Sequence, residues 1–131
     1  MGSVRGMERK SRVTTTAEKL MIKPGNRVSI DGTIDIGPHE GELVESDADI
    51  AIIVAPDAAT LQLEQRLPGL ENARAVWFCY PKGNVSDLNR GIIWAAMLEH
   101  GWRLNGNVAI DDYWSAVRAR PLQPGEKAEL P

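Results

Sequence analysis

The apolar positions of the chain fall into runs that are separated by glycine- and proline-rich turns. Two runs, at 49–54 and 75–80, are almost continuously apolar and rich in β-branched or aromatic residues, which is typical of strands buried on both faces of a parallel sheet. The short stretch at 27–30 is apolar at every second residue, so we expect a strand with one buried face there. A weaker extended segment is expected at 42–45.

Residues that cap helices stand before three further segments. Thr15 and Glu18 have the spacing of a capping box, in which each side chain bonds the backbone N–H of the other residue. Asp57 is a good cap for a helix that Pro68 and Gly69 would end. We therefore predict helices at 16–22, at 58–67, and from Ser86 or Asp87 to His100.

The last part of the chain has the pattern of two strands joined by a tight turn. We expect a strand at 102–110 with a turn or bulge at 105–107, a turn at 111–112, and a final strand at 113–120. The order of strands and helices predicts an α/β fold. It would be a single small Rossmann-like sandwich whose mostly parallel sheet is closed by a C-terminal antiparallel hairpin.

The length of 131 residues fits one domain. We place this domain at 17–120, between a basic arm at 1–16 that we expect to be disordered and a loose tail at 121–131. A single cysteine excludes a disulfide framework and a cysteine-based zinc cluster. We recognise no membrane span and no secretory signal, so we expect a cytoplasmic location. Met1 and Met7 are both candidates for the native start.

The formal net charge of −3 averages over regions of opposite sign. Residues 1–23 hold six basic and two acidic side chains, whereas residues 28–65 hold nine acidic and no basic side chains. Nucleic-acid binding depends on Lys and Arg that neutralise phosphates, so the acidic middle argues against a nucleic-acid partner. The basic arm is the one region where an anionic macromolecule is an alternative partner.

Several short motifs have counterparts in known proteins. Residues 22–30, Ile-Lys-Pro-Gly-Asn-Arg-Val-Ser-Ile, look like the beginning of a class I methyltransferase-like Rossmann domain. A second set consists of Tyr-Pro-Lys-Gly at 80–83, Asp-Leu-Asn-Arg at 87–90, Trp94, Val-Ala-Ile-Asp-Asp at 108–112 and Trp-Ser-Ala-Val-Arg at 114–118. This set resembles a family of small bacterial Rossmann-like proteins catalogued only as a domain of unknown function. The resemblance covers about residues 17–120 and implies the fold, but it implies no activity.

The position where a methyltransferase holds its cofactor differs in this chain. Those enzymes have a Gly-x-Gly turn directly after the first strand. Here the strand leads to Asp31 and Gly32, and the next glycine is Gly37, so the Gly-x-Gly spacing is missing. We therefore expect no cofactor and favour a protein that is not an enzyme. Asp31 and Gly32 are secondary candidates for contact with a small molecule.

The loop at 81–90 holds the first candidates for a binding site. It follows a buried strand and leads into a helix, whose N-terminal N–H groups and dipole attract anions. Lys82 adds a positive charge at this point. A structural alternative makes Ser86 and Asp87 simple helix caps. The candidate ligand- or anion-binding residues are Lys82, Gly83, Asn84, Ser86, Asp87, Asn89 and Arg90.

Secondary candidates lie in the last hairpin. Asp111 and Asp112 are paired carboxylates, which can hold Mg²⁺ or act as acid and base, but an Asp-Asp pair is also normal in a turn. Trp114 and Arg118 share one face of the last strand, which is either a half-exposed edge or a basic ligand face. We recognise no set of metal ligands. Cys79 lies inside an apolar strand and is expected to be an inert core thiol.

Two classes of function follow. The first, which we favour, is a non-catalytic binding or regulatory module whose last hairpin contacts a second copy of the chain or a protein partner. The alternative is a small-molecule domain with its site at the loops 31–37 and 81–90. That domain would take a nucleotide, a methyl donor or an anion, and it includes a degenerate methyltransferase-like enzyme. We expect no membrane partner in either class.

Overall fold

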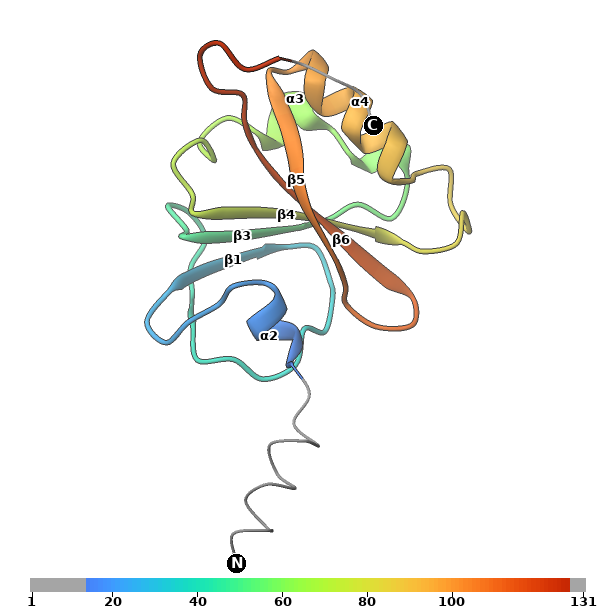
Figure 1. The fold of residues 1–131 in the computed structure, drawn as a ribbon. Coiled ribbons are helices and arrows are strands. Elements are labelled where there is room, and N and C mark those ends of the chain that lie inside the picture. Colours follow the sequence, from blue (N-terminus) through green and yellow to red (C-terminus); the bar gives the residue numbers. More distant parts are fainter. Residues whose placement is uncertain (1–13, 128–131) are drawn as a thin grey trace, which may run out of the picture.

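A six-stranded sheet forms the centre of the structure (Figure 1), a computed structural model that describes residues 14–127. The strands are β1 (Arg27–Asp31), β2 (Glu42–Leu43), β3 (Ile50–Val54), β4 (Ala75–Pro81), β5 (Trp102–Ala109) and β6 (Trp114–Pro121). They stand in the order β2-β1-β3-β4-β6-β5. The first four strands pair in parallel, and β6 runs antiparallel to both β4 and β5.

The prediction of a Rossmann-like α/β sandwich is wrong, because the helices are too few and too short to form a layer on each face of the sheet. The helices are α2 (Thr16–Lys19), the 3₁₀ helix η1 (Ala58–Thr60), α3 (Leu63–Arg66) and α4 (Arg90–Glu99). Within residues 14–127, only α4 is longer than four residues, whereas a doubly wound fold needs crossover helices on both faces. The protein is therefore a small mixed-sheet domain, mostly strand. The predicted C-terminal antiparallel hairpin is present as β5 and β6.

The helix predicted at 58–67 is broken in its middle. Asp57 caps its beginning as expected, because the carboxylate accepts a hydrogen bond from the N–H of Thr60 at 3.0 Å. Gln62 then takes a left-handed conformation with φ 43° and ψ 53°, which separates η1 from α3. Leu61 and Leu63, on either side of the break, both reach the core. The break in the helix thus allows both leucines to be buried.

The other two helices also differ from their predicted bounds. Asn89, rather than Ser86 or Asp87, caps α4, because its side-chain oxygen accepts a hydrogen bond from the N–H of Ile92 at 2.9 Å. The chain leaves α2 before residue 22 because Met21 adopts a positive φ of 70°. Both helices are consequently shorter than the sequence indicated.

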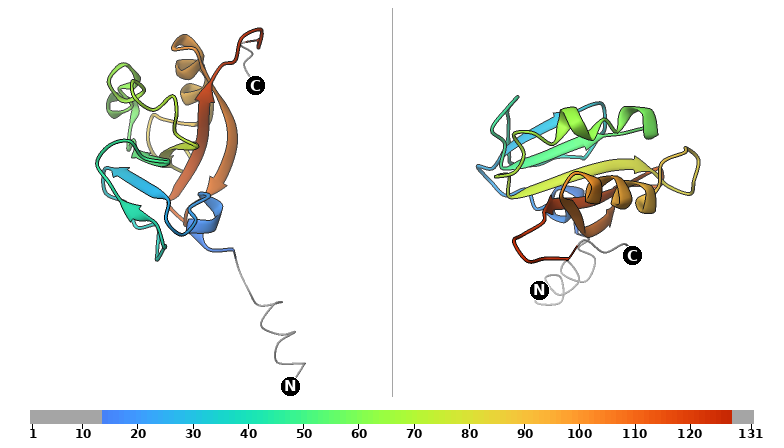
Figure 2. Two further views of the ribbon diagram at one scale, coloured as in Figure 1. Left: turned by 90° about the vertical axis from the view of Figure 1, so that its left-hand side faces the viewer. Right: turned by 90° about the horizontal axis from the view of Figure 1, so that it is seen from above.

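Both faces of β3 and β4 are buried, as their apolar runs predicted. One face packs against α3 and α4 and contributes Ile53 and Phe78 to the core on that side. The other face packs against α2 and contributes Ile52 and Trp77. Figure 1 shows α3 and α4 above β3 and β4 and α2 below them, and Figure 2 shows the same layers from two further sides.

The chain after β6 is held to the hairpin. Glu126 forms ion pairs with Arg103 at 2.8 Å and with Arg120 at 2.6 Å. The hydrogen bonds from Arg120 are the main reason why the pKa of Glu126 falls to about 2. The register of the hairpin shifts between Leu104 and Gly106, where the sequence predicted a turn or bulge.

Most of the predicted basic arm, residues 1–13, lies outside the described part of the chain, as do residues 128–131 at the end of the predicted tail. The start at Met1 or Met7 therefore stays open. Between residues 14 and 127, no helix combines the length and the apolar character that crossing a membrane requires.

Candidate functional site

Five of the seven loop residues predicted as ligand contacts line one hollow of about 340 Å³. Lys82, Gly83 and Asn84 come from the loop after β4, and Asn89 and Arg90 come from the start of α4. The remaining lining residues are Tyr80, Pro81 and Ser115. Residues from three separate segments of the chain therefore meet at the end of β4.

Two successive left-handed residues turn the loop directly after Lys82. Gly83 has φ 69° and Asn84 has φ 60°, and glycine and asparagine are among the residue types that adopt positive φ most readily. The backbone N–H of Lys82 donates to the carbonyl of Tyr113 at 2.8 Å. This bond joins the loop to the turn between β5 and β6 and so holds the backbone of Lys82 in place.

The charge of the hollow is positive. Lys82 and Arg90 are cationic, and none of the eight residues that line the hollow carries a carboxylate. The guanidinium carbon of Arg90 lies 5.1 Å from the ring centroid of Trp94, which is a cation–π contact. The N-terminus of the ten-residue helix α4 adds its dipole to the positive potential. This arrangement attracts an anionic group.

The sequence did not single out Ser115, which contributes a buried hydroxyl to the hollow. Ser115 is 9% exposed, and its hydroxyl lies 3.2 Å from the carbonyl of Val108, to which it donates. The available signal was a single polar residue inside the apolar stretch that starts at Trp114. The pairing of Ser115 with Tyr80 across β6 and β4, which places it at the end of β4, is visible only in the folded chain.

Ser86 and Asp87, the two other loop candidates, do not line the hollow. The hydroxyl of Ser86 accepts a hydrogen bond from the N–H of Leu88 at 3.1 Å. The Oδ1 atom of Asp87 accepts one from the N–H of Ala58 at 2.8 Å and so ties the loop to η1. Both residues therefore have structural roles, as the alternative to a binding site predicted. Neither of them caps α4, however, because Asn89 does so.

Asp31 and Gly32 lie at the end of β1 and take no part in the hollow beside α4. The carboxylate of Asp31 pairs with the guanidinium of Arg66 at 2.6 Å. Gly32 is packed against β3: a Cβ atom at this position would lie 2.7 Å from the Cβ of Val54. The glycine therefore serves the close approach of two backbones.

The turn of the hairpin engages Asp111. Its Oδ1 atom accepts hydrogen bonds from the N–H groups of Tyr113 and Trp114, both at 2.8 Å, which is normal turn chemistry. Asp112 is exposed beside it. The rings of Tyr113 and Trp114 meet edge to face with centroids 5.0 Å apart. Within the described range, no three His, Cys, Asp or Glu side chains gather in a way that could hold a metal ion.

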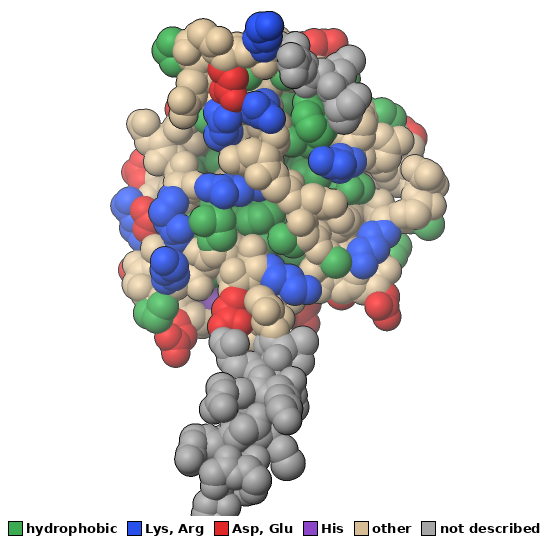
Figure 3. Space-filling view, viewed as in Figure 1, with side chains coloured by type: hydrophobic (Ala, Val, Ile, Leu, Met, Phe, Trp, Pro, Cys, Tyr) green, Lys and Arg blue, Asp and Glu red, His purple; other side chains and the backbone are tan. Residues whose placement is uncertain are grey.

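Basic side chains are spread over the face of the molecule that presents β5 and β6 (Figure 3). On β6, Arg118 is half-buried and its Nη2 donates to the carbonyl of Arg74 at 3.1 Å. Arg74 in turn donates to the carbonyl of Met21 at 2.7 Å. These bonds link β6 to the segment after α2, and the use of this face for a ligand stays a prediction.

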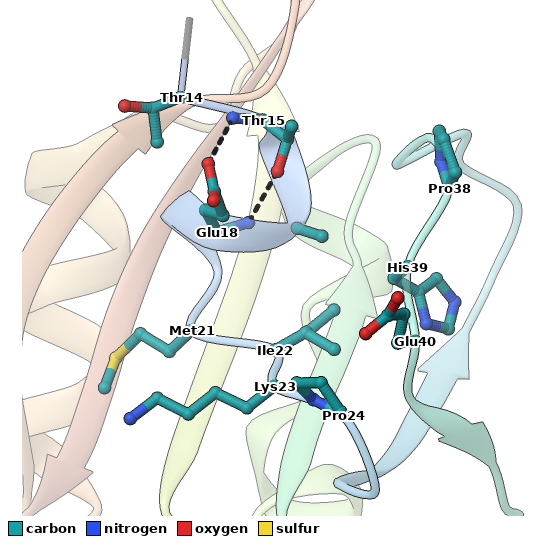
Figure 4. A pocket seen from close by; sticks show the side chains of 11 residues that line it. Thr14, Thr15, Glu18, Met21, Ile22, Lys23, Pro24, Pro38, His39 and Glu40 are labelled. Atoms are coloured by element: carbon teal, nitrogen blue, oxygen red, sulfur yellow. Dashed lines mark hydrogen bonds between the residues drawn. The ribbon is translucent and has the colours of Figure 1, made fainter. Parts of the chain in front are cut away.

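A larger hollow of about 690 Å³ lies between α2 and the segment 38–40 (Figure 4). Figure 4 shows the capping box of Thr15 and Glu18 at its upper end, which the sequence predicted. The Nδ1 atom of His39 accepts a hydrogen bond from the N–H of Gly41 at 3.1 Å. Its lining includes the carboxylates of Glu18 and Glu40, so this hollow is less suited to an anion than the hollow beside α4.

Cys79 lies in β4 and is fully buried. Burial raises the pKa of its thiol to about 12, with a smaller contribution from the carboxylate of Asp111. Because the thiolate is the reactive form, we expect iodoacetamide to modify native Cys79 at least about a thousandfold more slowly than the unfolded chain. Mass spectrometry of samples treated at mildly alkaline pH, with and without urea, measures both rates. Fast modification without urea would show that Cys79 is accessible.

Comparison with known proteins does not identify the chain: no protein-family model, no curated protein and no solved structure matches it. The resemblance to a family of small bacterial proteins, and the homodimer or protein partner expected at the last hairpin, therefore stay predictions.

Proposed function

We propose that this protein is a non-catalytic binding module that holds a small anion, a phosphate or a carboxylate group, in the hollow beside α4. The observation that carries this proposal is the convergence of Lys82 and Arg90 on one hollow whose lining contains no carboxylate. The side-chain NH2 groups of Asn84 and Asn89 add donors around the same space, whereas the hydroxyl proton of Ser115 is already donated to Val108. Charge-assisted hydrogen bonds of this kind are among the stronger polar contacts that proteins make.

The positions of the nearby carboxylates support binding rather than acid–base catalysis. Asp87 accepts a hydrogen bond from Ala58, and Asp111 accepts two from the turn of the hairpin. A general base must reach the proton that it removes, and these carboxylates are directed to backbone N–H groups instead. The buried thiol of Cys79 is likewise separated from solvent.

Titration with inorganic phosphate at constant ionic strength tests the proposal. We expect phosphate to shift the amide NMR signals of residues 82–91, and we expect Lys82→Ala to raise the dissociation constant about tenfold, because it removes one charge-assisted bond. Lys23→Ala is the matched control, since Lys23 is exposed and lies outside the hollow. Equal weakening by both substitutions, or no shift in the wild type, would contradict the anion site.

A further inference from the structure

A second polar hollow, of about 620 Å³, lies over β1 and β3 on the side of α3. Its floor is formed by paired residues of the two strands, with Ser29 beside Ala51 and Asp31 beside Ile53. One wall carries Gln62, Gln65, Arg66 and Leu70, and the other carries Val44 and Glu45. The volume falls within the range of roughly 300–1,000 Å³ that is usual for small-molecule sites.

The hollow exists because α3 is too short to cover β1. The left-handed turn at Gln62 leaves α3 with four residues, of which Leu63 belongs to the same core cluster as Ile53 of β3. The next strand, β1, presents Val28 to the buried core on the opposite face, whereas Ser29 is only half-buried and Asp31 is exposed. The floor of the hollow therefore combines the polar side chains of Ser29 and Asp31 with the buried apolar residues Ala51 and Ile53.

Arg66 is fixed at the wall of this hollow. Its Nε–H donates to the carbonyl of Thr60 at 3.2 Å, and its Nη1 donates to Oδ2 of Asp31 at 2.6 Å. The side chain of Arg66 is 17% exposed, although that of Asp31 is 66% exposed. A guanidinium has five N–H donors, so these two bonds leave donors for a further acceptor. Because Arg66 is already ordered, binding a carboxylate would cost little additional side-chain entropy.

The facing wall adds a second carboxylate to that of Asp31. Glu45 is exposed and belongs to the stretch 28–65, in which nine acidic and no basic side chains create a negative potential. The amides of Gln62 and Gln65 and the hydroxyl of Ser29 provide uncharged donors and acceptors between the two charges. The apolar part of the lining is formed by Ile30, Val44, Ala51, Ile53 and Leu70.

We infer that this hollow binds a free α-amino acid with an aliphatic side chain. The ammonium group pairs with Glu45, the carboxylate binds Arg66, and the side chain lies on the apolar part of the lining. A zwitterion offers an acceptor to the remaining N–H donors of Arg66 and a cation to Glu45. A simple anion leaves Glu45 without a cation, and a simple cation leaves those donors of Arg66 without an acceptor. The site is separate from the proposed anion site, because the two hollows share no lining residue.

Three probes that share a branched aliphatic chain separate the two charged contacts. L-Leucine has both charges, isocaproate lacks the ammonium group, and isoamylamine lacks the carboxylate. At constant ionic strength, we expect L-leucine to shift the amide NMR signals of Ser29, Ile53 and Gln65 and to bind at least about tenfold more tightly than either analogue. The inference is overturned if L-leucine leaves these signals unchanged, or if either analogue binds as tightly as L-leucine.

Two exposed glutamates of the same acidic stretch supply the matched substitutions. Glu45 lines the hollow, whereas Glu64 lies on α3 in the same acidic stretch, is exposed and does not line it. We expect Glu45→Gln to weaken L-leucine binding about tenfold and to remove its advantage over isocaproate. We expect Glu64→Gln to change neither, and phosphate binding beside α4 to be unaffected in both variants. If both substitutions weaken L-leucine binding equally, the effect comes from the overall negative charge of the stretch, and the proposed site is overturned.

Discussion

Gly32→Ala is expected to lower the free energy of unfolding by about 3–4 kcal/mol. The new Cβ atom would lie 2.7 Å from the Cβ and 3.0 Å from the Cγ2 of Val54, which is closer than side-chain carbons pack. Val54 belongs to a strand that is buried along its whole length, so it has little room to move. The backbone at Gly32 also has φ +116°, which residues with a side chain rarely adopt. Urea denaturation of the two proteins measures the difference.

Gly37 provides the control for the backbone part of this effect. It has φ +78°, but a Cβ atom at Gly37 would meet nothing within 4 Å. Gly37→Ala should therefore carry only the conformational cost, about 1 kcal/mol. Equal losses at Gly32 and Gly37 would show that the contact with Val54 is unimportant. In that case Gly32 would return as a candidate for contact with a ligand rather than with β3.

Trp77→Phe is expected to lower the free energy of unfolding by about 2–3 kcal/mol. The indole Nε1–H donates to the carbonyl of Leu20 at 3.0 Å, and this bond is buried. Phenylalanine would leave that carbonyl without its donor and would also leave a gap in a site where Trp77 is 2% exposed. The bond joins β4 to the end of α2, so hydrogen exchange at residues 16–22 should rise together with the loss of global stability.

Trp114→Phe is the matched control for this prediction. Trp114 is half-buried and packs beside Tyr113 at the start of β6, at the margin of the same core. We expect its replacement to cost less than about 1 kcal/mol, since a partly exposed ring loses less buried surface. A larger loss at Trp114 than at Trp77 would contradict the role of the Leu20 bond in fastening α2 to the sheet.

Local patterns predicted the strands well. The apolar runs at 49–54 and 75–80 correspond to β3 and β4, and both strands are buried on two faces. These predictions are confirmed because a strand between two packed layers needs apolar residues at every position. Such a run of consecutive apolar residues can be recognised in the sequence alone. The hairpin and its irregularity near residue 105 were predicted for a similar reason, since turn residues act locally.

The helices and the fold class depended on contacts that are distant in sequence. Asp57 capped its segment as predicted, but Gln62 broke the helix so that Leu61 and Leu63 could both be buried. The carboxylate of Asp87 accepts a hydrogen bond from the N–H of Ala58, which lies 29 residues away, and does not cap the helix that follows it. With these helices shortened, the sheet lacks the helical layers of a Rossmann-like sandwich, although its first four strands are parallel.

The sequence by itself determined which residues of the 81–90 loop carry charge and turn chemistry, and where the buried strands lie. Only the tertiary structure decided that Lys82 and Arg90 share a hollow with Ser115, because the pairing of β4 with β6 brings that serine to the end of β4. Likewise, the acidic stretch at 28–65 was visible as a charge pattern alone. Its contact with Arg66, through the carboxylate of Asp31, exists only in the folded chain. The physical reason is general: propensity and capping act within a few residues, whereas a binding site is formed by side chains that meet through packing.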